Sequence, residues 1–419
     1  ISIRALLLGS QAHGKTFIEN ILLSEDIINS INCLKKLGIK ISFNKKGCHI
    51  YGKGLNGFEY KKNIVLNAGN SGTFARLILG LLVKSPFYIK LVGDKSLSQR
   101  DFERVILPLQ EIGANFKVNI KKTLPLQIIG SAFTNPISYI ENRGSAQCKS
   151  TVMLAALNSP GKTVIKAKKS RDHTENIFKY LGIPIVVKKN KNYDEIKVEG
   201  QKIFNCFKYK VPSDPSSCAF FIVLTLLSNN CELKIKDVNV NKSRIGYIKI
   251  LNKMGAKIKI KNIKNRYGEK HADIFVKSQK NLRKINCPPS LNSNLIDEFL
   301  IIFLAAAKAK GVSSFKGLSE LNKKESPRLK LGSKLLNQLG IKNKLTKDSI
   351  KIFGNPGIDL KKSIHIKNYF KDHRIFMTSV IAAYTFGGKW KIDDMSSYKS
   401  SFPSFLNIIK KLGYKFKVS

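Results

Sequence analysis

Residues 66–82 read Leu66-Asn67-Ala68-Gly69-Asn70-Ser71-Gly72-Thr73-Phe74-Ala75-Arg76-Leu77-Ile78-Leu79-Gly80-Leu81-Leu82 and give the clearest structural signal in the chain. They predict a short turn followed by an apolar helix that opens at Ser71 or Gly72. Gly69 and Gly72 allow a sharp turn and leave room for a ligand beside the backbone. The N–H groups and positive dipole end of such a helix favour an anion, and Arg76 lies one turn further on. The same pattern is also typical of a plain turn before a buried helix.

Junctions of this kind, a short polar motif before an apolar helix, occur six times. They lie at residues 2–4, 70–73, 145–147, 214–217, 294–298 and 372–374. Between them a glycine repeatedly follows an amphipathic helix, as expected for a left-handed cap that turns the chain into the next strand. These glycines recur about every 70–85 residues, at Gly38, Gly113, Gly182, Gly255, Gly340 and Gly413. The repeats predict a two-domain α/β protein with six buried helices whose polar motifs face one cleft.

The composition agrees with two domains. A length of 419 residues suits two cores of about 200 residues each, and an apolar fraction of 43% can fill both. No apolar run approaches the ~20 residues of a membrane span and no secretory signal is visible, so we expect no membrane contact. The chain begins at Ile1, without Met and almost inside a motif, which predicts that a further segment precedes it.

Cysteine and histidine usage indicates a reducing compartment and no metal. The seven cysteines are scattered and never form a CxxC pair, and the six histidines form no HExxH motif. We therefore expect free thiols, a cytoplasmic protein and no metal site.

The net charge of +46 suggests nucleic-acid binding, since basic surfaces bind phosphate backbones. The lysines, however, are spread over nearly every surface segment beside many Asn and Ile residues, which indicates compositional drift and no specific nucleic-acid partner. Only eleven arginines occur, several of them at helix-opening motifs. Because a planar guanidinium binds carboxylate and phosphate through two hydrogen bonds, a cleft with several arginines predicts a small ligand with more than one anionic group.

Two motifs in the first half admit both a structural and a functional interpretation. The segment Asp94–Arg100 can be a capped helix start, with Ser98 as the cap and Glu103 in the first turn, or can place its arginine on an anion. The segment Ser145–Gln147 can cap the third buried helix, or can offer a hydroxyl and an amide to a polar substrate.

Carboxylates open three further helices. The segment Asn294–Glu298 places Asp297 before a strongly apolar helix, either as an N-cap or as a functional carboxylate. In Asp372–Arg374 the aspartate is the expected cap, and the arginine points to the cleft. The segment Ser170–Glu175 is typical of a capped helix start, but capping does not account for Arg171.

The segment Lys323–Arg328 is more specific. It puts two cations and a carboxylate into one predicted helix turn, with Lys324 and Arg328 four residues apart on one face. Like charges on one face cost stability unless an anion lies between them, so this segment predicts an anion site.

Taken together, eight motifs resemble the 5-enolpyruvylshikimate-3-phosphate synthase family, in the family order and over nearly the whole chain. They are Asn70–Arg76, Gly93–Arg100, Ser145–Gln147, Asp214–Ser217, Ile296–Glu298, Lys324–Arg328, Asp372–Arg374 and Ser401–Pro403. The resemblance implies two inside-out α/β domains of three β-α-β-rich subunits each, the enolpyruvyl transferase fold. It places the lobes at residues 1–212 and 213–419, with a hinge near residues 212–214 that closes the lobes on substrate.

The resemblance also implies the reaction. The enolpyruvyl group of phosphoenolpyruvate is transferred to the 5-hydroxyl of shikimate 3-phosphate, and phosphate is released, in aromatic amino-acid biosynthesis. No metal or organic cofactor is needed, and a monomer is expected.

Site residues follow from the resemblance residue by residue. Those implied to hold shikimate 3-phosphate are Arg4, Ser145, Ala146, Gln147, Arg171, Asp297 and Lys324. Those implied to hold phosphoenolpyruvate are Gly72, Arg100, Gln147, Arg328 and Arg374, supported by Asn70, Thr73 and Arg76. Asp297 matches the base that takes the proton of the 5-hydroxyl. Glu325 matches the acid that protonates the methylene carbon, with Lys324 as the alternative acid.

The sequence departs from the family pattern in several places. The family places a Lys-Ser pair immediately before the position of Ile1. Asp101 follows Arg100 where the family usually has Pro, and Ser326-Pro327 replaces a Ser/Thr-Asp pair. Ser400 stands where some members carry a substrate lysine, with Lys399 adjacent. Gly72 stands where some herbicide-tolerant members carry Ala, so the resemblance predicts sensitivity to glyphosate.

Three other functions are alternatives to this one. The sister transferase that acts on UDP-N-acetylglucosamine shares the fold, but its mobile Cys-bearing loop has no counterpart in residues 84–104. An RNA 3′-phosphate cyclase would need a catalytic His near the C-terminus and a nucleotide site. An inactive, basic polyanion-binding protein would be favoured if the preceding lysine were absent.

Overall fold

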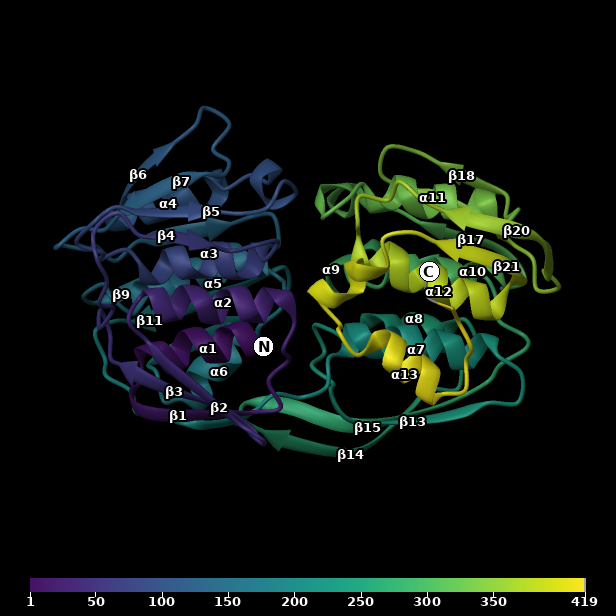
Figure 1. The fold of residues 1–419 in the computed structure, drawn as a ribbon, viewed down its shortest axis with the longest axis horizontal. Helices are drawn as coiled ribbons and strands as arrows, with labels where there is room; N and C mark the ends of the chain where they lie inside the picture. Colours follow the sequence, from purple (N-terminus) through teal and green to yellow (C-terminus); the bar gives the residue numbers. More distant parts are fainter. Residues whose placement is uncertain (418–419) are drawn as a thin grey trace. The chain divides into compact units, whose positions relative to one another are not determined.

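The computed structural model describes residues 1–417, which form two compact units (Figure 1). Unit 1 contains Ile1–Val211 together with Tyr267–Glu269, and unit 2 contains Pro212–Arg266 and the described residues from Lys270 onward. The predicted lobes and the hinge near residues 212–214 stay a prediction.

Unit 1 is built from three four-stranded sheets of the same topology (Figure 1). In each sheet one edge strand is parallel to its neighbour, and the remaining neighbours are antiparallel. The first sheet has the order β12 (Lys208–Lys210), β1 (His13–Glu19), β3 (Gly47–Lys53), β2 (Lys40–Asn44). The second has the order β4 (Val65–Asn67), β5 (Ile89–Val92), β7 (Leu126–Ile129), β6 (Asn115–Val118). The third has the order β8 (Ser138–Glu141), β9 (Lys162–Lys168), β11 (Tyr193–Glu199), β10 (Ile185–Lys189).

The helices of unit 1 alternate between buried and amphipathic ones. They are α1 (Ser2–Gln11), α2 (Glu25–Lys36), α3 (Gly72–Leu81), α4 (Glu103–Ile112), α5 (Ala146–Ala156) and α6 (His173–Tyr180), with the short 3-10 helix η1 (Leu97–Gln99). The helices α1, α3 and α5 bury nearly all of their side chains. They are the three buried helices that the sequence predicts for the first half.

Unit 2 follows this plan in one of its three sheets. One four-stranded sheet has the order β16 (Asn286–Cys287), β17 (Gly311–Phe315), β19 (Ile350–Gly354), β18 (Asn343–Leu345), again with one parallel edge pair. A three-stranded sheet has the order β13 (Glu232–Asn239), β15 (Glu269–Lys277), β14 (Lys259–Arg266). A parallel pair joins β20 (Leu360–Ile366) and β21 (Gly387–Ile392).

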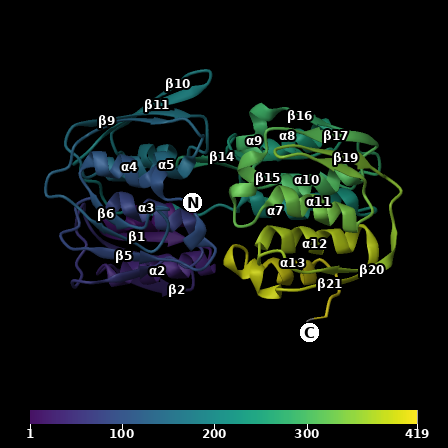
Figure 2. The ribbon, with the colours of Figure 1, turned by 90° about the horizontal axis from the view of Figure 1, so that it is seen from above.

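The helices of unit 2 (Figure 2) contribute to a second hydrophobic core. They are α7 (Pro215–Leu227), α8 (Gly246–Lys253), α9 (Asn292–Leu295), α10 (Phe299–Ala307), α11 (Arg328–Gln338), α12 (His373–Thr385) and α13 (Phe405–Lys411). Three 3-10 helices complete the unit: η2 (Pro289–Leu291), η3 (Ser319–Lys323) and η4 (Met395–Ser400). The predicted buried helices are α7, α10 and α12, and they pack against one another. All nine residues of α10 are buried.

Within the described residues, no single helix is long and apolar enough to cross a membrane. Residues 289–295 and 299–307 reach that length and apolar composition only when the two segments are taken together, and the chain bends by 117° between them.

The predicted helix-ending glycines are confirmed. All six have positive φ, from 69° at Gly182 to 122° at Gly113. A side chain in this left-handed region is strained whatever space surrounds it.

We expect Gly182→Ala to destabilise unit 1 through the backbone alone. An added Cβ at Gly182 meets no atom within 4 Å, so the cost is the left-handed φ of 69°, worth about 1–2 kcal/mol. Gly357→Ala is the matched control, because its φ is not in that region and its nearest atom would be 3.8 Å away. Thermal unfolding should show a lower midpoint for the first variant only; equal midpoints would contradict the expectation.

Candidate active site

The N-terminus of α3 lies against two guanidinium groups. Ser71 caps this helix, and its hydroxyl accepts a hydrogen bond from the backbone N–H of Phe74 at 3.3 Å. A Cβ added at Gly72 would lie 2.9 Å from Nη1 of Arg100 and 3.0 Å from Nη1 of Arg76. Glycine therefore allows both cations to approach the open end of the helix, where an anion is favoured.

Arg76 is buried and ties α3 to α5. It is 7% exposed, and its Nη1 donates to Oε1 of Gln147 at 2.8 Å. The amide nitrogen of Gln147 in turn donates to the hydroxyl of Thr73 at 3.0 Å. Nη2 of Arg76 donates to the carbonyl of Asp101 at 3.0 Å, and its guanidinium lies 4.8 Å over the ring of Phe102. Burial and the neighbouring arginine charges lower the pKa of Arg76 to about 10, so it remains charged at neutral pH.

Arg100 is oriented by the turn that precedes α3. Its Nη2 donates to Oδ1 of Asn70 at 2.8 Å, and the amide of Asn70 donates to Asp94 at 2.5 Å. Asp94 also accepts from the backbone N–H of Leu97 at 2.7 Å. The side-chain amide of Asn70 is thus fixed at both its oxygen and its nitrogen. Arg100 is thereby held, partly exposed, beside the helix start.

The start of α5 is held by a buried carboxylate. The carboxylate of Glu141, at the end of β8, accepts backbone N–H bonds from Arg143, Gly144 and Ser145 at 2.7–3.1 Å. Burial raises the pKa of Glu141, and these three hydrogen bonds oppose the rise. Ser145 then caps α5 by accepting from the N–H of Cys148 at 3.3 Å, which confirms its predicted capping role. Ala146 is the first residue of the helix.

Arg4 joins α1 to α5 and α6. Its Nε donates to the hydroxyl of Thr174 at 2.7 Å, and its Nη2 donates to the hydroxyl of Ser150 at 3.1 Å. A fully buried ion pair lies beside this contact, with Lys149 Nζ 2.5 Å from Glu175 Oε1. Thr174 and Glu175 lie in the first turn of α6, so this turn fixes Arg4. Arg171 lies just before it and is partly buried in the turn between β9 and α6.

In unit 2, Arg328 is the centre of a carboxylate cluster. It is 1% exposed, and its Nε and Nη2 donate to the two oxygens of Asp372 at 2.9 and 3.3 Å. Glu325 forms an ion pair with Nη2, and Asp297 Oδ1 lies 3.4 Å from Nη1. Burial alone would lower the pKa of Arg328, but the charges of Asp372, Glu325 and Asp297 outweigh it and raise that pKa. Ser326 adds a hydroxyl donor to Asp372 at 2.7 Å.

Asp297 connects the remaining cations of unit 2. Its Oδ1 also lies 3.4 Å from Nζ of Lys324, and its backbone carbonyl accepts from Nη1 of Arg374 at 2.9 Å. Asp372 caps α12 by accepting from the backbone N–H of Arg374 at 2.9 Å, as predicted. His373 lies between Asp372 and Arg374 in the chain. Burial lowers its pKa to about 4, so its imidazole is neutral at neutral pH.

Two of the capping alternatives and one local prediction are wrong. Ser98 does not cap the helix that follows: it lies in η1, and Asp101 Oδ1 accepts from the N–H of Glu103 at 2.7 Å where α4 begins. Glu103 does lie in the first turn. Asp297 is not a helix cap, because the N-cap of α10 is Glu298.

The third error concerns Lys324 and Arg328. They do not share a helix turn, since η3 ends at Lys323 and α11 begins at Arg328. The anion that accommodates both cations is present nonetheless, as the carboxylate of Asp297 lies 3.4 Å from each.

The predicted residues thus assemble within each unit. In unit 1, Gln147 connects Thr73 and Arg76, Gly72 lies beside Arg100, and Arg4 forms a separate contact on the same helix α5. In unit 2, the remaining residues form one cluster: Asp297, Lys324, Glu325, Arg328 and Arg374. Sequence reasoning missed Glu141, Ser150 and Thr174, because single polar residues at these positions carry no spacing signal.

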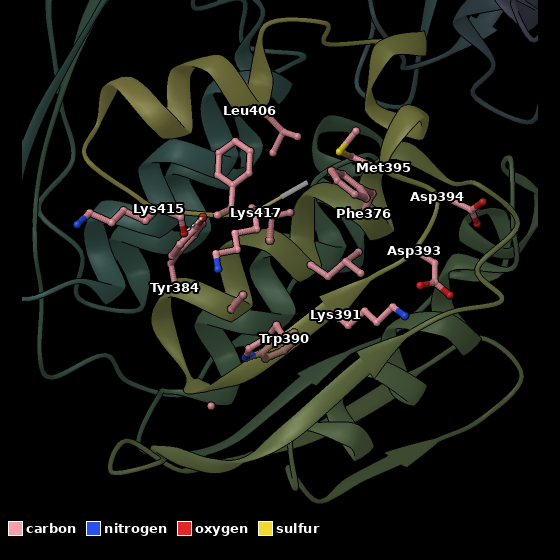
Figure 3. Close-up of a pocket in the computed structure, with 15 residues that line it drawn as sticks. Phe376, Tyr384, Trp390, Lys391, Asp393, Asp394, Met395, Leu406, Lys415 and Lys417 are labelled. Atoms are coloured by element: carbon pink, nitrogen blue, oxygen red, sulfur yellow. Dashed lines mark hydrogen bonds between the residues drawn. The ribbon is translucent and has the colours of Figure 1, made fainter. Parts of the chain in front are cut away.

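The described residues contain no group of three or more His, Cys, Asp or Glu side chains that could hold a metal ion. Unit 2 also contains a cavity of about 810 Å³ beside α12 and β21, lined by aromatic side chains such as Phe376, Tyr384 and Trp390 (Figure 3). None of the predicted site residues lines this cavity.

Comparison with solved structures defines the fold. The chain is similar to the enolpyruvyl transferase NikO from Streptomyces tendae, with a TM-score of 0.77, 12% identity and coverage of 99% of this chain and 92% of that chain. It is also similar to EPSP synthase from Acinetobacter baumannii, with a TM-score of 0.86, 32% identity and coverage of 100% and 94%. The predicted enolpyruvyl transferase fold is confirmed.

Comparison of sequences identifies the family within this fold. The family model of EPSP synthase (3-phosphoshikimate 1-carboxyvinyltransferase) matches residues 1–409. A 3-phosphoshikimate 1-carboxyvinyltransferase from Ruthia magnifica is 41% identical over 414 residues, covering 99% of this chain and 93% of the relative. One from Zymomonas mobilis is 36% identical over 423 residues, covering 100% and 93%. The chain belongs to the EPSP synthase family.

We expect Asp372→Asn to destabilise unit 2, because it leaves the buried guanidinium of Arg328 without its main counter-ion. Loss of one partner from a buried pair costs roughly 3 kcal/mol. Glu232→Gln is the control: its pair with Lys277 is 68% exposed on both sides, so the change should be below about 1 kcal/mol. Urea denaturation measures both, and equal effects of the two substitutions would contradict the expectation.

The same pair gives a pH dependence. Burial acts to raise the pKa of Asp372, but the charge of Arg328 prevails and holds that pKa below the ordinary value of about 3.9. The stabilisation by the Asp372–Arg328 ion pair is therefore present above about pH 4 and is lost as the pH falls through the lowered pKa of Asp372. The difference between wild type and Asp372→Asn should shrink in acid.

Proposed function

We propose an assignment of the side chains of both units to the reaction of this family. As a member of the EPSP synthase family, the chain transfers the enolpyruvyl group of phosphoenolpyruvate to the 5-hydroxyl of shikimate 3-phosphate and releases phosphate. The observation that carries the assignment is the pair of cations, Arg76 and Arg100, at the glycine-opened start of α3. A helix start with two guanidinium groups suits a phosphorylated carboxylate.

Phosphoenolpyruvate is assigned to the arginines of both units. In unit 1, Gly72, Arg100 and Gln147 are the proposed ligands, with Asn70, Thr73 and Arg76 holding them in place. In unit 2, Arg328 and Arg374 are the proposed ligands. Arg328 suits this role because Nε and Nη2 keep it on Asp372, whereas Nη1 makes only a 3.4 Å contact with Asp297, which a substrate carboxylate could replace at the same edge.

Shikimate 3-phosphate is assigned to a second set of residues. Those proposed in unit 1 are Arg4, Ser145, Ala146, Gln147 and Arg171, and those in unit 2 are Asp297 and Lys324. Arg4 is supported in this role because two hydroxyl groups, of Thr174 and Ser150, orient its guanidinium. The N–H of Ser145 is held by Glu141, and the positive dipole end of α5, which begins at Ala146, favours a phosphate.

The chemistry is an addition followed by an elimination. The 5-hydroxyl oxygen bonds to C2 of phosphoenolpyruvate and loses its proton, while C3 gains a proton, which gives a tetrahedral intermediate. The C2–O bond to phosphate then breaks as C3 loses a proton, which restores the enolpyruvyl double bond on the new oxygen. The net result is transfer of the group and release of inorganic phosphate.

Asp297 is the proposed base and Glu325 the proposed acid, with Lys324 as the alternative acid. Asp297 Oδ1 lies 3.4 Å from both Lys324 Nζ and Arg328 Nη1, and such neighbours favour the ionised carboxylate that a base requires. Glu325 is within ion-pair contact of Arg328 and is 25% exposed, so it is accessible to substrate. We further propose a cytoplasmic monomer that needs no cofactor.

The deciding experiment is phosphate release from phosphoenolpyruvate, measured with and without shikimate 3-phosphate. Release that requires shikimate 3-phosphate is the expected result. Phosphate release that does not require shikimate 3-phosphate, or the absence of any release, overturns the proposed substrates. In that case, binding to duplex DNA that Arg100→Ala leaves unchanged would favour a polyanion-binding protein.

We expect Gly72→Ala to weaken phosphoenolpyruvate binding and inhibition by glyphosate. The new methyl would lie 2.9 Å from Arg100 Nη1 and 3.0 Å from Arg76 Nη1, so at least one guanidinium must move. Loss of one charge-assisted hydrogen bond, worth about 1.5–3 kcal/mol, raises KM for phosphoenolpyruvate roughly tenfold or more. Steady-state kinetics with Gly357→Ala as the control tests this, and an unchanged inhibition constant would count against it.

We expect Asp297→Asn to lower kcat about 10²–10⁴-fold with little change in KM, because it removes the base but keeps the side-chain shape. Phosphate release at saturating substrates measures the effect. Retention of wild-type kcat would show that another group takes the proton of the 5-hydroxyl.

A further inference from the structure

A buried polar network in unit 2 involves none of the residues assigned to substrate. Asp214 caps α7 by accepting from the N–H of Ser217 at 2.9 Å. Its other oxygen accepts from Nη2 of Arg244 at 2.8 Å, and the same Nη2 donates to the hydroxyl of Ser216 at 2.9 Å. The hydroxyl of Ser216 donates in turn to Oε1 of Glu298. The network therefore runs from the start of α7 to the residue that precedes α10.

Most of this network is deeply buried. Glu298 and Ser216 are each 1% exposed and Arg244 is 8% exposed, whereas the side chain of Asp214 is 43% exposed. Removing charged groups from water is costly, and well-packed apolar residues are often at least as stable in their place. The helices α7 and α10 already pack against each other (Figure 2), and all nine residues of α10 are buried and apolar. Stability alone is therefore a poor reason for a carboxylate at this position.

Glu298 does not act as an ordinary helix cap either. It is the N-cap residue of α10, but its side chain makes no capping hydrogen bond. Its carboxylate is directed to Ser216 on α7. A side chain that could bind its own helix start is used to connect two helices.

The network reaches the site through one peptide unit. Glu298 directly follows Asp297, and its N–H donates to the carbonyl of Leu295 at 2.9 Å. The carbonyl of Asp297 accepts from Nη1 of Arg374 at 2.9 Å. The Asp297–Glu298 peptide is thus held on one side by the α7 network and on the other by a proposed phosphoenolpyruvate ligand. Movement of Glu298 would displace both the Asp297 carboxylate and the anchor of Arg374.

We propose that Glu298, held by Ser216 and Arg244, is a positioning residue that aligns the Asp297 carboxylate and Arg374 for the addition step. The proposal rests on the proposed function, in which Asp297 is the base. It assigns a role to the motif Asp214–Ser217, which makes none of the proposed substrate contacts. Misplacement of a reacting group by about 1 Å can cost about 10²-fold in rate.

The test compares Glu298→Gln and Ser216→Ala with the control Ser228→Ala, which removes a hydroxyl near the other end of α7. Steady-state kinetics and thermal unfolding are measured for each full-length variant. We expect kcat to fall about tenfold to hundredfold for Glu298→Gln and by a smaller factor for Ser216→Ala, with KM for shikimate 3-phosphate nearly unchanged. The control should match wild type.

A double variant distinguishes positioning from a structural role. In an Asp297→Asn background, Glu298→Gln should lower kcat by a clearly smaller factor than in wild type, because no base is left to align and only the effect through Arg374 remains. The proposal is overturned if Glu298→Gln retains wild-type kcat, or if it lowers kcat by the same factor with and without Asp297. If the Glu298→Gln variant does not fold, Ser216→Ala takes its place in the same comparison, because that substitution keeps the charges of Glu298 and Arg244.

The outcome is separable from the proposed function. Wild-type phosphate release that does not depend on shikimate 3-phosphate overturns the function itself. Dependence on shikimate 3-phosphate together with an unaffected Glu298→Gln overturns only the positioning role.

Discussion

The candidate site depends on one constraint: an apolar helix buried in a core leaves its first N–H groups in need of polar partners at its start. In this chain the caps of α3, α5, α7 and α12 are Ser71, Ser145, Asp214 and Asp372. Ser71, Ser145 and Asp372 each lie within a few residues of a cation or an amide of the site, namely Arg76, Gln147 and Arg374. The groups that make the cores foldable are therefore the same groups that prepare anion sites, because a helix start attracts negative charge.

The arginines divide according to their partners. Arg76 and Arg328 are almost fully buried and are held by several acceptors, so they act as fixed parts of the protein. Arg100 and Arg374 are partly exposed and are anchored through a neighbouring amide or carbonyl. Arg76 stiffens the frame, and Arg100 and Arg374 remain available to a ligand, while the buried Arg328 is proposed to offer its Nη1 edge, whose contact with Asp297 is 3.4 Å long. The planar guanidinium suits both roles, because it can keep one edge on the protein and offer the other.

Sequence reasoning succeeded where a local rule acts. The left-handed glycines at 38, 113, 182, 255, 340 and 413 follow from the ends of amphipathic helices, and all have positive φ. Reasoning failed at Ser98, where the chain forms a 3-10 turn and the helix begins five residues later at Glu103. It also failed for Lys324 and Arg328, because a four-residue spacing places two side chains on one face only if the intervening residues are helical.

By itself, the sequence determined the six-fold repeat, the buried helices with their polar starts, and the family, because these depend on periodicity, glycine and local motifs. Only the tertiary structure decided which polar groups meet. The contacts of Arg4 with Ser150 and Thr174, and of Glu298 with Ser216, join residues 82 to 170 positions apart in the chain. Such pairs depend on how whole helices pack against one another, and a one-dimensional pattern does not contain that information.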